Sequence, residues 1–382
     1  MDDAGGGRRG ARATVSAELW EVLAAGWAIP RQRGRDLGGS LNLNLLVRRG
    51  DERLVVRVHR PSVSPARLEA IQHARQQLDA AGVPCSALVA ARDGACWARA
   101  AGRLVEVERH IAHDGRMNTP PRLARGLPLL GRVHALLAGA EVSPAGRSVE
   151  FANHIEPGAV LSGTRAGTAR IRGWHPPPDE RRMASQAERL AELVAAGEAG
   201  LVAGLPRQLV HGDFWDDNVF FQGETLVFVA DFAFMAERAR IDDLALTLYC
   251  ADTEAGLTTS PDRIAALRPL VHGYASGLGN PLTDAEHQAL PWAGSRCSMT
   301  RTPPGRMPAP PPPPSAAPCS WSPTSAPGRP GYPDADPARR PAERPVLRGD
   351  RRDSSWRQFA QIGGIARVVN LQRDHAGPQQ QR

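Results

Sequence analysis

The stretch from residue 209 to residue 246 constrains the fold more than any other part of the chain. It begins with an apolar strand end at Leu209–Val210, passes through the polar loop His211–Asn218, and then reaches a second apolar strand over residues 226–230, which delivers Asp231. Each polar segment sits beside a short β-like segment, where a rigid scaffold can aim side chains into a cleft. The pattern therefore predicts a site built from two loops.

Asp213, Asn218 and Asp231 are the candidate functional residues of these loops. Phosphoryl transfer needs a carboxylate beside the attacking hydroxyl and hard oxygen ligands for Mg²⁺ on the nucleotide phosphates. A His-Gly-Asp tripeptide alone is more often an ordinary turn. The composite is more specific: HGDxxxxN, an apolar strand ending in Asp-Phe, and then Asp-Leu-Ala follow the order of a kinase catalytic loop, a metal-binding loop and the next helix.

On these motifs the chain resembles the aminoglycoside phosphotransferase family, the small-molecule kinases of the protein-kinase-like fold. The resemblance implies that Asp213 is the catalytic base, that His211 organises the catalytic loop, and that Asn218 and Asp231 hold Mg²⁺. It also implies that Asp243 braces the catalytic loop. The chain has Asp-Phe-Ala where protein kinases have Asp-Phe-Gly, a difference shared by many small-molecule kinases.

The fold that the resemblance implies is α+β and bilobal. We expect an N-lobe with a small antiparallel β-sheet over residues 15–110 and a mainly helical C-lobe over residues 111–292. Residues 1–14 are rich in Gly and Arg and are predicted to be disordered. Residues 140–178, rich in Gly and Pro with few apolar anchors, are predicted to form a loop on the substrate side.

The nucleotide side of the site is predicted from a glycine turn and one arginine. Gly38-Gly39-Ser40 separates two predicted strands, where a kinase-like fold covers the ATP phosphates with backbone N–H groups. Arg57 lies where the resembled family has its phosphate-binding lysine, and the chain contains no Lys. Arg57 either grips phosphate oxygens or is an ordinary solvent-facing strand residue. Glu69, the one Glu on the following helix, is the predicted partner of Arg57, although Gln72 lies nearer the usual spacing.

Charge and composition separate a nearly neutral body from a basic tail. From residue 294 to the end there are 14 Arg against 6 acids, and 17 of the 34 prolines. The tail's excess of 8 positive charges (14 − 6) is larger than the net charge of +7 for the whole chain. Residues 1–293 are therefore nearly neutral and give no sign of a nucleic-acid-binding surface. Residues 293–382 are predicted to be a low-complexity tail that is disordered or not native-like.

The five cysteines are scattered and form no C-x-x-C pair, which indicates neither a disulfide framework nor a zinc site. No run approaches 18 apolar residues, and the first residues contain no apolar signal segment. We therefore expect a cytoplasmic protein with no membrane partner.

The leading functional hypothesis is an ATP- and Mg²⁺-dependent phosphotransferase that acts on a hydroxyl of a small molecule, such as an aminoglycoside-like antibiotic, an amino alcohol or a sugar. One alternative is a protein Ser/Thr kinase on the same fold. Another is a nucleotide-binding pseudokinase or an incomplete product, which the missing Lys and the aberrant tail favour and the intact Asp213, Asn218 and Asp231 oppose. The sequence does not identify the acceptor.

Overall fold

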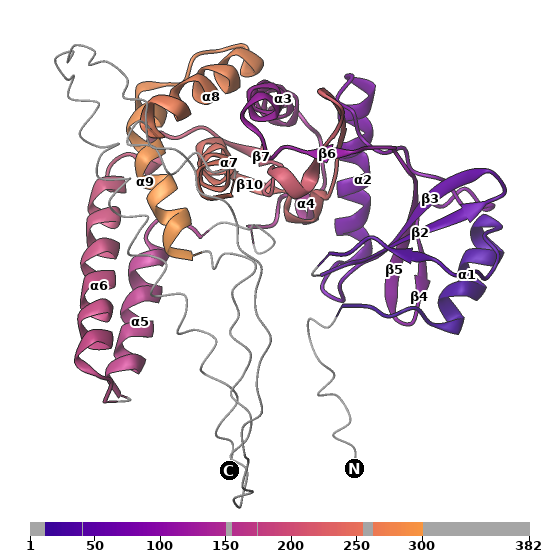
Figure 1. The fold of residues 1–382 in the computed structure, drawn as a ribbon, viewed down its shortest axis with the longest axis horizontal. Coiled ribbons are helices and arrows are strands. Elements are labelled where there is room, and N and C mark those ends of the chain that lie inside the picture. Colours follow the sequence, from indigo (N-terminus) through magenta and orange to yellow (C-terminus); the bar gives the residue numbers. More distant parts are fainter. Residues whose placement is uncertain (1–11, 40, 150–154, 174, 255–262, 301–382) are drawn as a thin grey trace, which may run out of the picture.

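The computed structural model describes residues 12–39, 41–149, 155–173, 175–254 and 263–300. These residues form two lobes, a sheet-rich N-lobe and a mainly helical C-lobe (Figure 1). The predicted α+β bilobal architecture is confirmed. Among the described helices, none has the length and apolar character needed to cross a membrane.

The N-lobe is a five-stranded antiparallel sheet with strand order β1-β2-β3-β5-β4. Leu43, Leu45 and Val47 alternate along one face of β2 and pack into the same core as Trp27 of helix α1. Alternate burial of this kind is expected of a strand with one face on the core. The element bounds are α1 Ala17–Trp27, β1 Arg35–Asp36, β2 Leu43–Arg49, β3 Glu52–Val58, β4 Ala98–Ala100 and β5 Arg103–Arg109.

Helix α2, Pro65–Ala80, belongs to the N-lobe and lies between the two lobes, against the C-lobe (Figure 1). Its start is capped, because the Ser64 side chain accepts a hydrogen bond from the Arg67 amide and Pro65 occupies the first turn. The buried Arg67 side chain donates to the carbonyls of Ala233 and Met235, next to Asp231. Helix α2 is therefore fastened to the second predicted site loop.

The C-lobe combines two short antiparallel sheets, β10-β7 and β6-β8-β9, with six longer helices. The bounds of its helices are α3 Pro120–Ala138, α4 Pro144–Arg147, α5 Ala159–Gly173, α6 Pro178–Glu198, α7 Arg240–Glu254, α8 Arg263–Leu278 and α9 Asp284–Thr300. Its strands are β6 Gly115–Arg116, β7 Arg207–Val210, β8 Val219–Gln222, β9 Thr225–Val229 and β10 Ala236–Ala239, with 3-10 turns at Val202–Gly204, Asp216–Asn218 and Phe232–Phe234.

Helices α3 and α8 pack backbone to backbone. A Cβ added at Gly131 would lie 2.1 Å from the Tyr274 carbonyl oxygen, and one at Gly277 would lie 1.7 Å from the Pro128 carbonyl oxygen. Backbone atoms cannot move aside as a flexible side chain can, so both positions require glycine. This close crossing places α3 beside the catalytic loop.

The prediction of a loop over residues 140–178 is wrong. This segment contains α4 and α5, and α5 lies alongside α6 as a pair at the edge of the C-lobe (Figure 1). Helix α5 buries few residues, chiefly Val160 and Ile171, and its remaining sequence is rich in Gly, Thr and Arg. The apolar periodicity that normally reveals a helix is therefore weak here.

The predicted tail boundary at residue 293 is also wrong, because α9 continues through it to Thr300. Ala293 and Cys297 are buried in the C-lobe core, and the buried Arg296 forms ion pairs with Glu198 (2.9 Å) and Asp242. The rest of the predicted tail lies outside the described residues. At the other end, residues 12–14 of the predicted disordered N-terminus are described, and residues 1–11 are not.

Candidate active site

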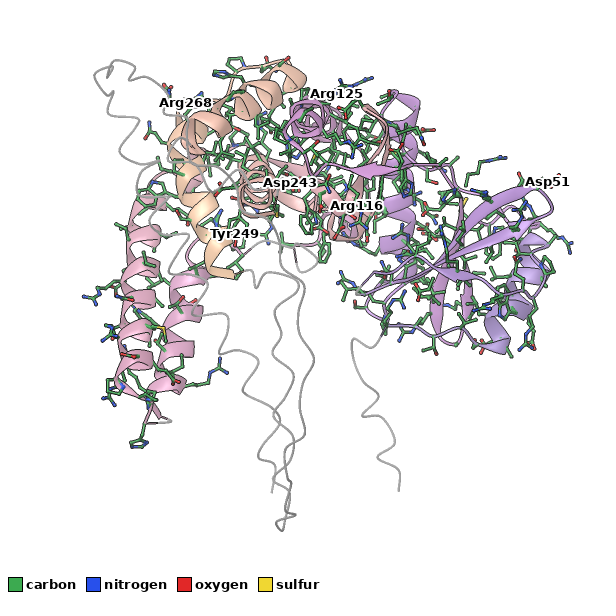
Figure 2. All side chains as sticks on the ribbon, in the orientation of Figure 1. Asp51, Arg116, Arg125, Asp243, Tyr249 and Arg268 are labelled. Carbon is green, nitrogen blue, oxygen red and sulfur yellow. The ribbon has the colours of Figure 1, made fainter. Side chains whose placement is uncertain are left out.

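The loop between β7 and β8 turns at Gly212, which has φ +82°. A Cβ at this position would lie 2.2 Å from the Phe234 carbonyl oxygen, so the left-handed conformation and the close approach both require glycine. The Gly212 amide donates to Asp243 Oδ2 at 3.1 Å. Asp243 is fully buried in α7, among the C-lobe helices (Figure 2). The contact that the resemblance implied between this carboxylate and the loop is present.

His211 joins the two predicted site loops. Its Nδ1 accepts a hydrogen bond from the Asp213 amide (3.2 Å), which leaves Nε2 to donate to the Ala230 carbonyl oxygen (3.0 Å). The Ala230 amide in turn donates to the Asn218 carbonyl oxygen (2.8 Å). Burial lowers the pKa of His211 despite the opposing charge of Asp243, so the ring is neutral and suited to this bridging role.

Asp213 and Asn218 are in direct contact. The Asn218 Nδ2 group donates to Asp213 Oδ2 (2.9 Å) and to the Asp213 carbonyl oxygen (2.8 Å), and each residue is 8% exposed. This bond fixes the orientation of the carboxylate at the mouth of the loop. Because Asn218 donates to Asp213 through its nitrogen, its side-chain oxygen Oδ1 is directed away from Asp213 and can accept a cation.

Asp231 has a left-handed backbone conformation (φ +56°, ψ +72°). Its Oδ1 accepts from the Ala233 amide at 3.2 Å, and its Oδ2 lies 3.5 Å from the Arg57 guanidinium. A left-handed non-glycine residue is strained by roughly 1–2 kcal/mol and is typical of functional sites. The partly exposed carboxylate of this C-lobe residue faces Arg57 of the N-lobe strand β3.

The chemistry of these donors fits a divalent cation. Asp231 supplies a partly exposed carboxylate and Asn218 an amide oxygen, both hard ligands of the type that Mg²⁺ and Ca²⁺ prefer. The described residues contain no cluster of three His, Cys, Asp or Glu side chains able to hold an ion by themselves. A cation at this site would therefore need further oxygen ligands, as nucleotide phosphates and water provide.

Arg57 is buried and faces carboxylates of the neighbouring strand β5. Its guanidinium lies 3.1 Å from Glu108 and 3.6 Å from Glu106, and β5 pairs with β3 so that Arg57 is directly opposite Glu106. Burial alone lowers the pKa of Arg57, but the charges of Glu108, Asp231 and Glu106 outweigh it and raise the pKa. The alternative of a solvent-facing strand residue is excluded.

The prediction that Glu69 is the partner of Arg57 is wrong. Glu69 is exposed and accepts a hydrogen bond from Trp97 Nε1 at 3.2 Å. Helix α2 instead presents two donors, Gln72 and Arg75, to the carboxylates of β5: Gln72 Nε2 lies 2.8 Å from Glu106, and Arg75 bonds both Glu106 and Glu108. The acids come from the sheet and the donors from the helix, which reverses the expected arrangement.

The glycine turn lies between β1 and β2 as predicted. Gly38 (φ +91°) and Gly39 (φ +107°) both have positive φ, and the Leu37 amide donates to the Asn44 carbonyl oxygen at 2.8 Å to close the turn. Ser40 lies outside the described residues.

His134 of α3 is buried on the same helix face as Leu127, Leu130 and Leu137, and it contacts Asp243. Its Nε2 lies 3.0 Å from Asp243 Oδ2, and its Nδ1 lies 2.7 Å from the Tyr274 hydroxyl. The helix pair α3–α8 thus supports the carboxylate that holds the catalytic loop.

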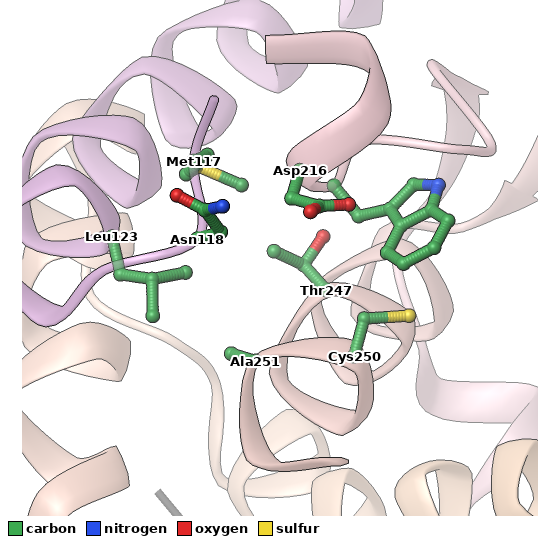
Figure 3. A pocket seen from close by; sticks show the side chains of 8 residues that line it. Met117, Asn118, Leu123, Asp216, Thr247, Cys250 and Ala251 are labelled. Carbon is green, nitrogen blue, oxygen red and sulfur yellow. The ribbon is translucent and has the colours of Figure 1, made fainter. Parts of the chain in front are cut away.

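A small pocket opens beside the catalytic loop (Figure 3). Asp216 and Thr247 point into it from one side and Asn118 from the other (Figure 3). Asp216 Oδ1 is buried without a hydrogen-bond partner among the described residues, and burial, reinforced by the neighbouring Asp217, raises the pKa of Asp216. The remaining walls are largely apolar and are formed by Met117, Leu123, Trp215, Cys250 and Ala251.

Two kinds of relatives bear on the fold and the chemistry. Homoserine kinase from Gluconacetobacter diazotrophicus is 29% identical over 284 residues, covering 70% of this chain and 82% of the relative. Homoserine kinase from Azorhizobium caulinodans is 27% identical over 261 residues, covering 66% and 73%. An amicoumacin kinase solved with AMP-PNP, Ca²⁺ and its substrate has a TM-score of 0.55 at 14% identity, covering 74% of this chain and 83% of that one. An aminoglycoside phosphotransferase from Alicyclobacillus acidocaldarius also has a TM-score of 0.55 at 14% identity, with 75% and 84% covered. At such identities the solved structures establish the fold.

The fold, the family profile and the homoserine kinase relatives together define a small-molecule kinase, a phosphotransferase with a hydroxyl acceptor. Residues 34–281, about two thirds of the chain, match the profile of the phosphotransferase enzyme family, APH. The chain belongs to that family.

Proposed function

We propose that this protein transfers the γ-phosphate of ATP to the hydroxyl of a small amino alcohol, with Asp213 as the catalytic base. The observation that carries the proposal is the contact between Asp213 and Asn218, tied through His211 and Ala230 to the loop of Asp231. This arrangement puts a fixed carboxylate next to two oxygen ligands, which is what phosphoryl transfer requires.

On the nucleotide side, Arg57 and the turn at Gly38 and Gly39 are proposed to hold the phosphates. The use of ATP is supported by family membership and by the AMP-PNP in the amicoumacin kinase structure. Mg²⁺, when bound, would neutralise charge on the phosphates, with Asn218 and Asp231 as its protein ligands. We place the boundary between the lobes at residues 110–111, where β5 has ended and the chain enters the C-lobe.

On the acceptor side, Asp213 orients the hydroxyl and takes up its proton late, since positioning contributes most of the acceleration in this chemistry. Transfer then requires that the acceptor hydroxyl contact Asp213 Oδ1 or Oδ2 and lie in line with the γ-phosphate.

The acceptor is proposed to carry an ammonium group that pairs with Asp216. The relatives named homoserine kinase are consistent with an amino alcohol. Asp216 lies three residues after Asp213, its side chain points into the pocket, and its buried Oδ1 has no hydrogen-bond partner among the described residues. An ammonium group would satisfy that oxygen, whereas an unpaired buried oxygen costs about 1–3 kcal/mol.

The test is an ADP-release assay of the full chain with Mg²⁺ and ATP on homoserine, ethanolamine, 1-amino-2-propanol, kanamycin and spectinomycin. We expect turnover on at least one amino alcohol, lost in Asp213→Asn with nucleotide binding retained. N-acetylation of the accepted substrate should abolish recognition, and Asp216→Asn should raise the KM for the amine at least tenfold. The exposed neighbour Asp217→Asn is the control for Asp216. Nucleotide binding without turnover on the whole panel would instead support the pseudokinase alternative.

A further inference from the structure

The glycine turn is held from outside the sheet by a side chain of the segment that precedes α1. Arg12 forms a bidentate ion pair with Asp36 (2.8 and 2.5 Å) on the strand before the turn. The same guanidinium donates to the Gly38 carbonyl oxygen in the turn (3.2 Å) and to the Asn42 carbonyl oxygen after it (3.0 Å). One planar group therefore contacts the entry, the apex and the exit of the turn.

Other bonds continue this contact toward the site. Asp36 Oδ1 accepts from the Gly38 amide at 2.8 Å, so Gly38 is held at both its amide and its carbonyl. The Asn42 side chain accepts from the Arg60 amide at 3.0 Å, which connects the exit of the turn to the end of β3, three residues after Arg57.

Arg12 is itself anchored to a rigid element. Ala13 packs against the N-lobe core, and Ser16 caps α1 four residues later, with its hydroxyl accepting from the Leu19 amide at 3.1 Å. The guanidinium thus braces the turn from the segment that precedes α1. The turn has two glycines, and its other restraints near Gly38 are the Asn44 Nδ2 bond to the Gly38 carbonyl (3.0 Å) and the Leu37 amide bond to the Asn44 carbonyl (2.8 Å).

We infer that Arg12 is a positioning residue that keeps the glycine turn in its nucleotide-binding conformation, an inference that rests on the proposed function. A single exposed ion pair contributes little, typically 0–1 kcal/mol. Arg12 differs because its four bonds go to three points of one glycine-containing turn, so losing it removes a restraint from all three points at once. The affinity for nucleotide then falls in proportion to the fraction of molecules whose turn keeps the binding conformation. Arg12 need not contact the nucleotide for this effect.

The experiment measures the Kd of Mg·AMP-PNP by calorimetry on the full chain, for wild type, Arg12→Ala, Arg12→Lys and Asp36→Asn. The matched control is Arg49→Ala. Arg49 lies at the end of β2 away from the glycine turn, donates two bonds to Glu52 Oε2, and donates one bond to the backbone carbonyl of Trp27. We expect Arg12→Ala to weaken binding about tenfold, or about 1.4 kcal/mol. Arg12→Lys should fall between, because one ammonium cannot reach all three acceptors, and Arg49→Ala should bind as wild type does.

A double-mutant cycle separates positioning from general stability. The losses from Arg12→Ala and Asp36→Asn should be less than additive in Kd, because both remove the same brace. Unchanged Kd in Arg12→Ala, or a lowered melting temperature with unchanged Kd, would overturn the inference while leaving the kinase proposal intact. A wild-type protein that binds no nucleotide would overturn both.

Discussion

The buried charges around Arg57 make a sharp prediction about two glutamates. Glu108 is 3% exposed and accepts from Arg57 (3.1 Å) and from Arg75. Glu69, which the sequence favours as the partner of Arg57, is exposed and bonded only to a tryptophan indole among the described contacts. We expect Glu108→Gln to be strongly destabilising and Glu69→Gln to be nearly silent.

The magnitude follows from the charge count of the cluster. Arg57 and Arg75 are balanced within the sheet and helix by Glu106 and Glu108, all four being less than a tenth exposed. Removing one acid leaves a buried positive charge uncompensated, and breaking a buried pair costs about 3–5 kcal/mol. Glutamine keeps an acceptor oxygen, so we expect the lower end, about 3 kcal/mol. The raised pKa values of both arginines prevent relief by deprotonation.

The assay is urea unfolding at pH 7, followed by circular dichroism, on wild type and both variants. In a thermal melt, the same loss of about 3 kcal/mol corresponds to a fall of roughly 5 °C in Tm for a folded part of this size. Glu69→Gln should remain within about 0.5 kcal/mol of wild type. Equal effects of the two substitutions, or a larger effect at Glu69, would refute the assignment of the arginine partners to β5.

Three other predictions concern the C-lobe. Burial raises the pKa of Glu198 to about 7; because the folded chain then holds this proton more tightly than the unfolded chain, stability should fall by up to about 3 kcal/mol as the pH rises from about 4.5 to 7, and Glu198→Gln should flatten the Tm–pH curve in that window. Gly131→Ala forces a Cβ against the Tyr274 carbonyl oxygen and should cost at least about 3 kcal/mol in urea unfolding. His134→Gln loosens Asp243 beneath the catalytic loop and should lower kcat about tenfold with little change in the KM for ATP, as steady-state kinetics would show.

The parts of the site predicted from sequence are those whose contacts are local. His211, Asp213 and Asn218 lie within eight residues, and Ala230, the partner of His211, lies nineteen residues on. Loop geometry over such short separations is set by the residues themselves, including the positive φ of Gly212. The bilobal architecture was expected from the family resemblance that these motifs carry.

The parts that the sequence did not reveal depend on contacts between distant elements. Helix α9 contains residues that read as an irregular sequence, yet Arg296 is buried against Glu198 and Asp242, respectively 98 and 54 positions away. An arginine inside a Pro- and Ser-rich segment normally indicates solvent exposure. Only the acids placed by α6 and α7 make its burial favourable.

Glu106 and Glu108 illustrate why the partner of Arg57 was assigned to the wrong element. Both glutamates alternate with valines on β5, a pattern that predicts a strand with one polar face and says nothing about which cations it meets. The strand register supplies that information: Arg57 lies opposite Glu106, and Glu108 is two residues further along the same face.

The lack of lysine in this chain and the position of Glu106 and Glu108 on β5 have one physical explanation. An ammonium group is a compact donor that one helix glutamate can satisfy, whereas a guanidinium is a planar fork with donors on three nitrogens. At Arg57 each nitrogen faces a different carboxylate: Nε faces Glu106, one terminal nitrogen faces Glu108, and the other faces Asp231. Two of these acids are fixed by the adjacent strand and are themselves held by Arg75, so only the third nitrogen is directed at the partly exposed carboxylate of the site loop. Under the proposed function, a cation bound to Asp231 would compete with this nitrogen, and the geometry that fixes Arg57 would leave that one donor for a phosphate oxygen of the nucleotide.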